Sequence, residues 1–198
     1  MKRVPLLIAS SLIFVHSVCA AEQGDILVRL GALNVDPKSN NHDIVSVDSA
    51  IMLTFNGTYM VQPNWGVELL AALPFEHDID LVGGGKVAET KHLPPTLSVQ
   101  YHFAPEGQIR PYVGAGVNLT LFFDESTTGA LETSSLSLGT SVGLALQAGV
   151  DIPVGERWFV NLDVRYIDIE TKAKLDGTSL GDVKIDPWVY GVNLGYRF

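Results

Sequence analysis

Cysteine is nearly absent from this sequence, which has only Cys19 among its 198 residues. Because Cys19 lies in an apolar N-terminal segment, the remaining chain offers no disulfide, thiolate metal site or cysteine nucleophile. Positive charge is scarce as well, since 13 Lys and Arg stand against 22 Asp and Glu, a net charge of −9. Nucleic acid is bound mainly through basic contacts to phosphate, so this balance argues against it as a partner.

Long hydrophobic runs are missing too. After the N-terminal segment, no stretch approaches the length of apolar sequence that a transmembrane helix requires. The mean hydropathy is nevertheless positive. Such a chain can still enter a bilayer as a closed β-barrel, because only helices and closed barrels pair every backbone polar group internally.

The N-terminal segment has the layout of a secretory signal peptide. A basic start at residues 2–3 precedes an apolar run over 4–15 and small residues before Ala21. We therefore expect residues 1–20 to be cleaved and residues 21–198 to be the mature protein. The apolar run is too short for an uncleaved anchor, which needs about 20 residues. Lipoprotein processing at Cys19 is a further alternative, which the residues before it do not favour.

Alternation of apolar and polar residues predicts eight strands in the mature chain. They span 26–34, 49–60, 65–75, 94–103, 110–122, 139–152, 158–169 and 187–198. Short turns are expected at 61–64, 104–109 and 153–157, and long loops at 35–48, 76–93, 123–138 and 170–186. This alternation of connection lengths is typical of outer-membrane barrels with short periplasmic turns.

The predicted fold class is therefore all-β, an eight-stranded antiparallel transmembrane β-barrel with short periplasmic turns and long extracellular loops. The expected location is the outer membrane of a Gram-negative cell. An even number of strands places both termini in the periplasm.

The last strand shows which face meets lipid. Trp188, Tyr190 and Phe198 share one face with other apolar residues, whereas Asn193 and Arg197 share the other. An Arg that faced lipid at mid-bilayer would cost about 2–4 kcal/mol, so the apolar face is expected outward. A soluble lipocalin-like barrel is the alternative. It would carry lysines along its strands, but every mature lysine falls in a predicted loop.

Several motifs resemble those of the outer-membrane protein W (OmpW) family, which includes alkane-uptake proteins. They are GVELLAA at 66–72 followed by Pro74-Phe75, HLPPTL at 92–97, RPYVGAG at 110–116, GVD at 149–151, and DPW at 186–188 leading to GYRF at 195–198. Each motif is short, but together they run in order through nearly the whole mature chain.

The resemblance implies passive uptake of small hydrophobic molecules through a narrow apolar lumen, with release sideways into the bilayer. Pro94 and Pro95 are the candidates for that lateral exit, because proline has no N–H to donate to a strand ladder. The alternative is that both prolines only end a long loop and direct the strand that follows. Leu70, Tyr112, Phe159 and Val189 are candidates for an apolar lining of the lumen.

The inward faces also carry many polar residues. The candidates for a polar network in the lumen are Arg29, Glu68, Gln100, Gln147, Asp163, Arg165 and Arg197. Buried charge is tolerated when it is paired, so Glu68 is expected to meet an inward Arg, and Asp163 to meet Arg165 or a neighbour. Any apolar pocket is therefore expected in the extracellular half, with a polar plug below it.

No enzyme is expected, since serines such as Ser126, Ser134 and Ser135 have no histidine base nearby in the sequence. No cofactor or metal is expected either. The alternative to transport is a structural or adhesive outer-membrane barrel with a filled lumen. Expected partners are membrane lipid, lipopolysaccharide, the outer-membrane assembly machinery, which reads a terminal phenylalanine, and small apolar solutes.

Overall fold

The computed structural model describes residues 21–37, 45–47, 49–72, 75–81, 86–128 and 132–198. The predicted signal peptide at 1–20 lies outside these residues. None of the described segments forms a helix with the length and hydropathy needed to cross a membrane.

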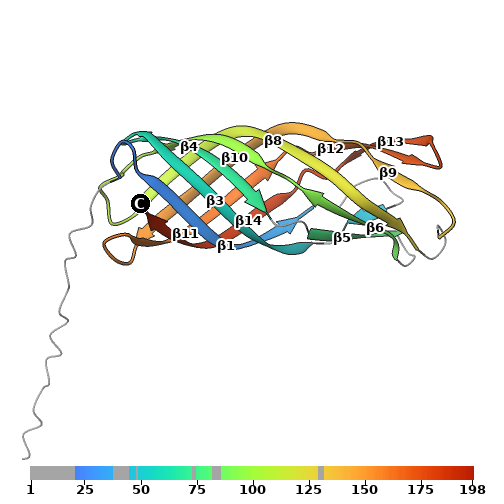
Figure 1. Cartoon of the computed structure of the whole chain (residues 1–198), viewed down its shortest axis with the longest axis horizontal. Helices are drawn as coiled ribbons and strands as arrows, with labels where there is room; N and C mark the ends of the chain where they lie inside the picture. Colours follow the sequence, from blue (N-terminus) through green and yellow to red (C-terminus); the bar gives the residue numbers. More distant parts are fainter. Residues whose placement is uncertain (1–20, 38–44, 48, 73–74, 82–85, 129–131) are drawn as a thin grey trace, which may run out of the picture.

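Eight antiparallel strands close into a barrel (Figure 1), which confirms the predicted fold class. In order around the wall they are β1 (Ile26–Asp36), β3 (Ala50–Gln62), β4 (Trp65–Ala72), β7 (Thr96–His102), β8 (Arg110–Thr127), β10 (Ser141–Pro153), β11 (Trp158–Ile167) and β14 (Trp188–Arg197). The first and last strands pair from Leu27↔Arg197 to Asp36↔Trp188, and β10 pairs with β8, so the ring is complete.

Further strands extend the barrel beyond this ring, within segments that were expected to be loops. They are β2 (Val45–Val47), β5 (Phe75–Leu81), β6 (Lys86–Leu93), β9 (Leu136–Leu138), β12 (Glu170–Leu175) and β13 (Thr178–Lys184). The long segments between the barrel strands thus contain strands of their own, which the sequence did not predict. Outside the bilayer the outer face of a strand can meet water. β12 buries Thr171 and Ala173 on its inner face but carries charged residues such as Lys172 and Lys174 on its outer face, so it lacks the apolar outer face of a membrane strand.

Both described ends of the chain lie at one end of the barrel. Ile26 and Phe198 exchange backbone hydrogen bonds there, with N···O distances of 3.4 and 2.9 Å. The short turns after β3, β7 and β10 lie at the same end, whereas β5, β6, β9, β12 and β13 lie at the opposite end (Figure 1). The short-turn end is the periplasmic end and the strand extensions are extracellular.

The polarity of the wall is inverted relative to a soluble protein. Large apolar side chains such as Ile51, Leu144 and Val192 are mostly exposed on the outside, whereas Arg29 and Glu68 are fully buried inside. A soluble protein rarely exposes so continuous an apolar surface. The outer face is therefore the surface that contacts membrane lipid.

Aromatic side chains mark the edges of this apolar band. Trp65 packs edge-on against Tyr101 at the periplasmic side, with ring centroids 4.9 Å apart. At the extracellular side Tyr166 lies 5.4 Å from Trp188. Such rings are typical of the interfacial girdles of membrane barrels.

Two inward glycines of β14 make room inside this narrow barrel. A side chain at Gly195 would overlap the ring of Phe159, and one at Gly191 would overlap the carboxylate of Asp163. The glycine-rich inner face of the last strand therefore accommodates large side chains from the neighbouring strand β11.

Candidate functional site

The extracellular half of the lumen is filled by an apolar cluster, called the apolar chamber below. Its buried members are Leu33, Val35, Met52, Leu70, Ala145, Ile167, Ile169 and Val189, with Phe122 and Ile185 packed against them. They come from seven of the eight strands of the ring, all except β7, and from Ile169 and Ile185 beyond the strand ends. The chamber is an apolar environment enclosed by the barrel wall.

A small cavity of about 20 Å³ lies within the chamber. Pro94, Phe122 and Val189 are among the residues that line it. A space of this size holds about one water molecule. The chamber is thus nearly filled by its own side chains, and an apolar guest has to displace some of them.

A network of charged and amide side chains, called the polar plug below, lies on the periplasmic side of the chamber. Arg29 binds Asp151 through two hydrogen bonds, Nε to Oδ1 at 3.2 Å and Nη2 to Oδ2 at 2.8 Å. Its Nη1 also donates to Thr58 Oγ1 at 2.8 Å and lies 3.7 Å from Glu68 Oε2. A buried guanidinium is stable only with such partners.

Arg165 connects the other two carboxylates of the plug. It donates to Glu68 Oε1 at 2.7 Å and to Asp163 Oδ2 at 2.8 Å. Gln100 donates to the second oxygen of Glu68 at 2.9 Å. The plug therefore joins side chains from β1, β4, β7, β10 and β11 across the full width of the lumen.

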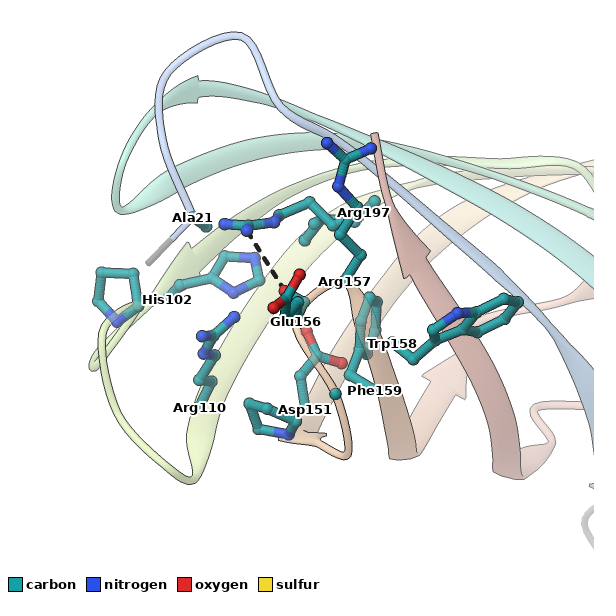
Figure 2. A pocket seen from close by; sticks show the side chains of 13 residues that line it. Ala21, His102, Arg110, Asp151, Glu156, Arg157, Trp158, Phe159 and Arg197 are labelled. Atoms are coloured by element: carbon teal, nitrogen blue, oxygen red, sulfur yellow. Dashed lines mark hydrogen bonds between the residues drawn. The ribbon is translucent and has the colours of Figure 1, made fainter. Parts of the chain in front are cut away.

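The periplasmic end is closed by a second layer below the plug. Figure 2 shows Asp151, Phe159 and His102 around a pocket whose volume is about 10 Å³, together with Ala21 from the N-terminal segment. Ala21 is buried, and its N–H donates to the carbonyl of Pro105 at 3.4 Å. This volume is at the lower limit for one water molecule, so the periplasmic mouth admits no larger solute in this state.

Among the described residues, the ladder of the barrel wall has a break beside the apolar chamber, between β4 and the strand pair β6–β7. The β4–β7 pairs end at Leu70↔Thr96, and the next described pair across this wall is Phe75↔His92, between β5 and β6. Ala71 and Pro95 are the described residues next to the last pair. We call this interruption the seam.

The two prolines at the seam have different surroundings. The carbonyl of Pro95 accepts the N–H of Leu119 at 2.9 Å, so the peptide groups of Pro95 face β8. The carbonyl of Pro94 accepts hydrogen bonds from Asn118 Nδ2 at 3.2 Å and from Thr96 Oγ1 at 3.3 Å. Pro94 has no N–H to donate, and its ring is buried against the cavity of the chamber, beside the seam.

Comparison with known proteins identifies the group to which this barrel belongs. The model of the OmpW family matches residues 22–198. Outer membrane protein W of Escherichia coli (strain K12) is 42% identical over 195 residues, which cover 92% of each chain. The chain belongs to the OmpW family. This OmpW-family barrel is accordingly a protein of the Gram-negative outer membrane, where its outer face is surrounded by lipid.

Two further similarities extend this result. Outer membrane protein AlkL of Ectopseudomonas oleovorans is 35% identical over 179 residues, which cover 85% of this chain and 75% of the relative. The crystal structure of the outer membrane protein OprG from Pseudomonas aeruginosa superposes with a TM-score of 0.83. It is 37% identical and covers 91% of this chain and 99% of that chain.

The structure of this OmpW-family barrel separates the four residues that were expected to line the lumen. Leu70 and Val189 belong to the apolar chamber. Tyr112 and Phe159 are also buried, but they lie beside the Arg29 guanidinium, at 5.3 and 5.4 Å from ring centroid to Cζ. These two rings therefore cover the polar plug instead of lining an apolar passage.

Most of the expected network residues lie in or beside the plug. Arg29, Glu68, Gln100, Asp163 and Arg165 make the contacts given above, and Gln147 is buried against Gly114. Arg197 was expected there too, but this placement is wrong. It lies at the periplasmic rim, where Nη1 is 3.5 Å from Asp25 and Nη2 reaches the Glu156 carbonyl (dashed line in Figure 2). Arg29 pairs with Gly195, so Arg197 is nearer the strand end than the plug.

Asp151 is a further plug residue, which the sequence did not predict. It holds Arg29 and also accepts a hydrogen bond from Asn161 Nδ2 at 2.7 Å. The signal was present, because Asp151 continues the inward phase of Gln147 and Gly149 along β10.

Proposed function

We propose that this protein lets small apolar molecules pass passively from the cell surface into the apolar chamber and out sideways through the seam into the bilayer. One observation carries the proposal: Pro94 lines the cavity of the chamber and leaves the wall without a backbone donor at the seam. The chamber and the gap in the ladder are thus adjacent. The proposal involves no catalytic step.

The polar plug supports a sideways route over a straight one. An apolar molecule that moved through the lumen would have to displace the hydrogen bonds of Arg29, Glu68 and Arg165, which are all fully or nearly buried. Leaving such groups unpaired is costly. Movement through the seam leaves these bonds intact.

Such a route would let apolar solutes bypass the extracellular leaflet of the membrane. Lipopolysaccharide presents a charged, polar surface that apolar solutes cross poorly, and the chamber lies behind it inside the wall. We propose that the outer strands contact lipopolysaccharide. We also propose that the assembly machinery of the outer membrane receives the last strand, whose outward aromatic face ends at Phe198.

A second candidate function is a structural or adhesive barrel with a filled lumen. The observation that favours it is the small size of the cavity, about 20 Å³, in the chamber. This candidate predicts no solute flux, whereas the transport proposal predicts that the chamber side chains move apart when a guest enters.

The two prolines provide a matched test. Pro94→Ala restores a backbone donor beside the cavity of the chamber, and Pro95→Ala restores one beside β8, where Leu119 already donates to the Pro95 carbonyl. The experiment measures entry of an alkane into cells that lack other alkane carriers, for example by its rate of oxidation in the cell interior. Lipopolysaccharide must be present, because apolar solutes cross simple phospholipid vesicles unaided.

We expect Pro94→Ala to reduce entry severalfold and Pro95→Ala to leave it nearly unchanged. Heat-modifiable migration on gels verifies that both variants form barrels. If cells with the wild-type protein take up no more alkane than cells without it, the filled-barrel candidate holds. If the two variants behave alike, the exit role of the seam is rejected.

A further inference from the structure

A hollow lies on the outer, lipid-facing wall, separate from the lumen. It is lined by residues of β1, β3, β4 and β7, namely Ile26, Phe55, Gly57, Tyr59, Val67, Leu69, Ala71 and Leu97. Its volume is about 350 Å³, which is within the range of small-ligand sites. We call it the lipid groove.

Gly57 forms the floor of the lipid groove. It faces outward between Phe55 and Tyr59 of the same strand, and a Cβ added there would have no atom within 4 Å. Gly57 also has no positive φ angle. Glycine weakens a strand interior, and here neither close packing nor backbone conformation requires it. What the missing side chain does is leave a depression between larger neighbours.

The groove has a direction along the membrane normal. Its lower end, at Ile26 and Tyr59, lies near the periplasmic girdle of Trp65 and Tyr101. From there it rises along β3 and β4 to Ala71 and Leu97, next to the seam. An acyl chain of a phospholipid in the periplasmic leaflet runs in the same direction, from the interface toward the bilayer centre.

We infer that the lipid groove is a binding site for one acyl chain of a periplasmic-leaflet phospholipid. The hollow is continuous with the surface that already contacts lipid. Water is not a stable occupant, because a depression with mostly apolar walls offers it too few hydrogen-bond partners. An unfilled hollow would forfeit dispersion contacts along its whole lining. In hydrocarbon, packing of this kind is what selects one contact over another.

This inference does not depend on transport. If apolar molecules leave through the seam, they enter the bilayer beside this bound chain. If they do not, the chain occupies the groove all the same.

The experiment places the purified protein in nanodiscs of phosphatidylethanolamine and phosphatidylglycerol. A small fraction of the phosphatidylethanolamine carries a diazirine in the middle of one acyl chain. After irradiation, mass spectrometry measures adducts on peptides of the groove wall and of the opposite wall, at residues 142–150. We expect about fivefold more adducts at the groove, a preference that several additional dispersion contacts supply.

Two variants fill the groove from neighbouring strands, Gly57→Leu from β3 and Ala71→Leu from β4. Each should reduce the adducts on the groove wall to the level of the opposite wall. Ala148→Leu is the matched control, because Ala148 is exposed on β10, across the ring from β3, and it should leave the pattern unchanged.

Heat-modifiable migration verifies each barrel, and a variant that does not fold is replaced by the other. Uniform labelling of the wild-type wall would overturn the inference. So would groove labelling that persists in a folded, filled variant. Neither result bears on the proposed transport, because the experiment measures lipid adducts and not solute entry.

Discussion

Arg29 and Asp151 meet inside the barrel through a two-point contact, with Nη2 2.8 Å from Oδ2 and Nε 3.2 Å from Oδ1. The two residues are 122 positions apart in the sequence, on β1 and β10. Both side chains are buried, so the pair joins two distant strands in a region that water does not screen. A contact of this kind fixes the register of the wall and closes the lumen at the same time.

The first prediction concerns this pair. Asp151→Asn keeps the shape of the side chain but leaves Arg29 with Glu68 as its remaining carboxylate, at 3.7 Å. Removing one partner of a buried pair costs about 3–5 kcal/mol, and we expect the lower end because Glu68 remains. Urea unfolding in phospholipid vesicles measures the loss.

Asp25→Asn is the control for this change. Asp25 pairs with Arg197 at the partly exposed rim, where an ion pair contributes about 1 kcal/mol or less. Equal losses for the two variants would show that the plug is not the stabilising network described here.

The second prediction concerns the apolar chamber. Val189→Phe enlarges a fully buried side chain that lines the cavity, so entry of apolar solutes should fall to the level of cells without the protein. Overpacking of this kind costs about 1–3 kcal/mol, which a barrel tolerates. Val192→Phe on the same strand faces lipid and should leave entry unchanged. Normal entry in the folded Val189 variant would mean that solutes do not use the chamber.

The third prediction concerns pH at the extracellular end. Partial loss of hydration and the neighbouring carboxylate of Asp186 raise the pKa of the exposed Asp168 above its usual value near 3.8. The folded state then holds this proton more tightly than the unfolded chain, so the contribution to stability falls as pH rises through this window. Protection of the Ile185 amide, which donates to Ile169 at 2.9 Å, should decrease over the same range.

Amide hydrogen exchange measures this protection once the intrinsic pH dependence of exchange has been subtracted. The charged side chains of Asp186, Glu170 and Lys184 also act on Asp168, so wild type is compared with Asp168→Asn. The variant should show a smaller decrease. Identical slopes would exclude Asp168 as the source.

The sequence predicted the wall of the barrel closely, because lipid imposes a strict alternation on every strand that crosses it. From Trp188 to Phe198 each outward position is apolar, and the opposite face carries glycine, Asn193 and Arg197. The same phase placed Arg29, Glu68 and Arg165 inside. The phase did not predict how far along the barrel axis these side chains lie, because that level depends on the stagger between neighbouring strands.

The depth of a side chain along the barrel axis explains why three residues were predicted at the wrong level of the lumen. Tyr112 and Phe159 have the inward phase of lining residues, but the stagger of β8 and β11 brings them beside Arg29. The same effect leaves Arg197 at the rim. The extracellular strands, such as β12 and β13, were missed for another reason. The outer face of β12 is charged and β13 is exposed almost throughout, so neither has the apolar outer face by which the membrane strands were recognised.

If apolar molecules leave the chamber through the seam, a reversible covalent lock across the seam stops their entry into the cell. The predicted mature chain has no cysteine, so Ala71→Cys with Pro95→Cys introduces one thiol pair, at the first position beyond Leu70↔Thr96. Alkane entry is measured in cells whose disulfide has been verified, before and after a reductant. We predict entry at background level when oxidised and recovery when reduced. Unchanged entry with the seam locked would rule out the seam as the exit.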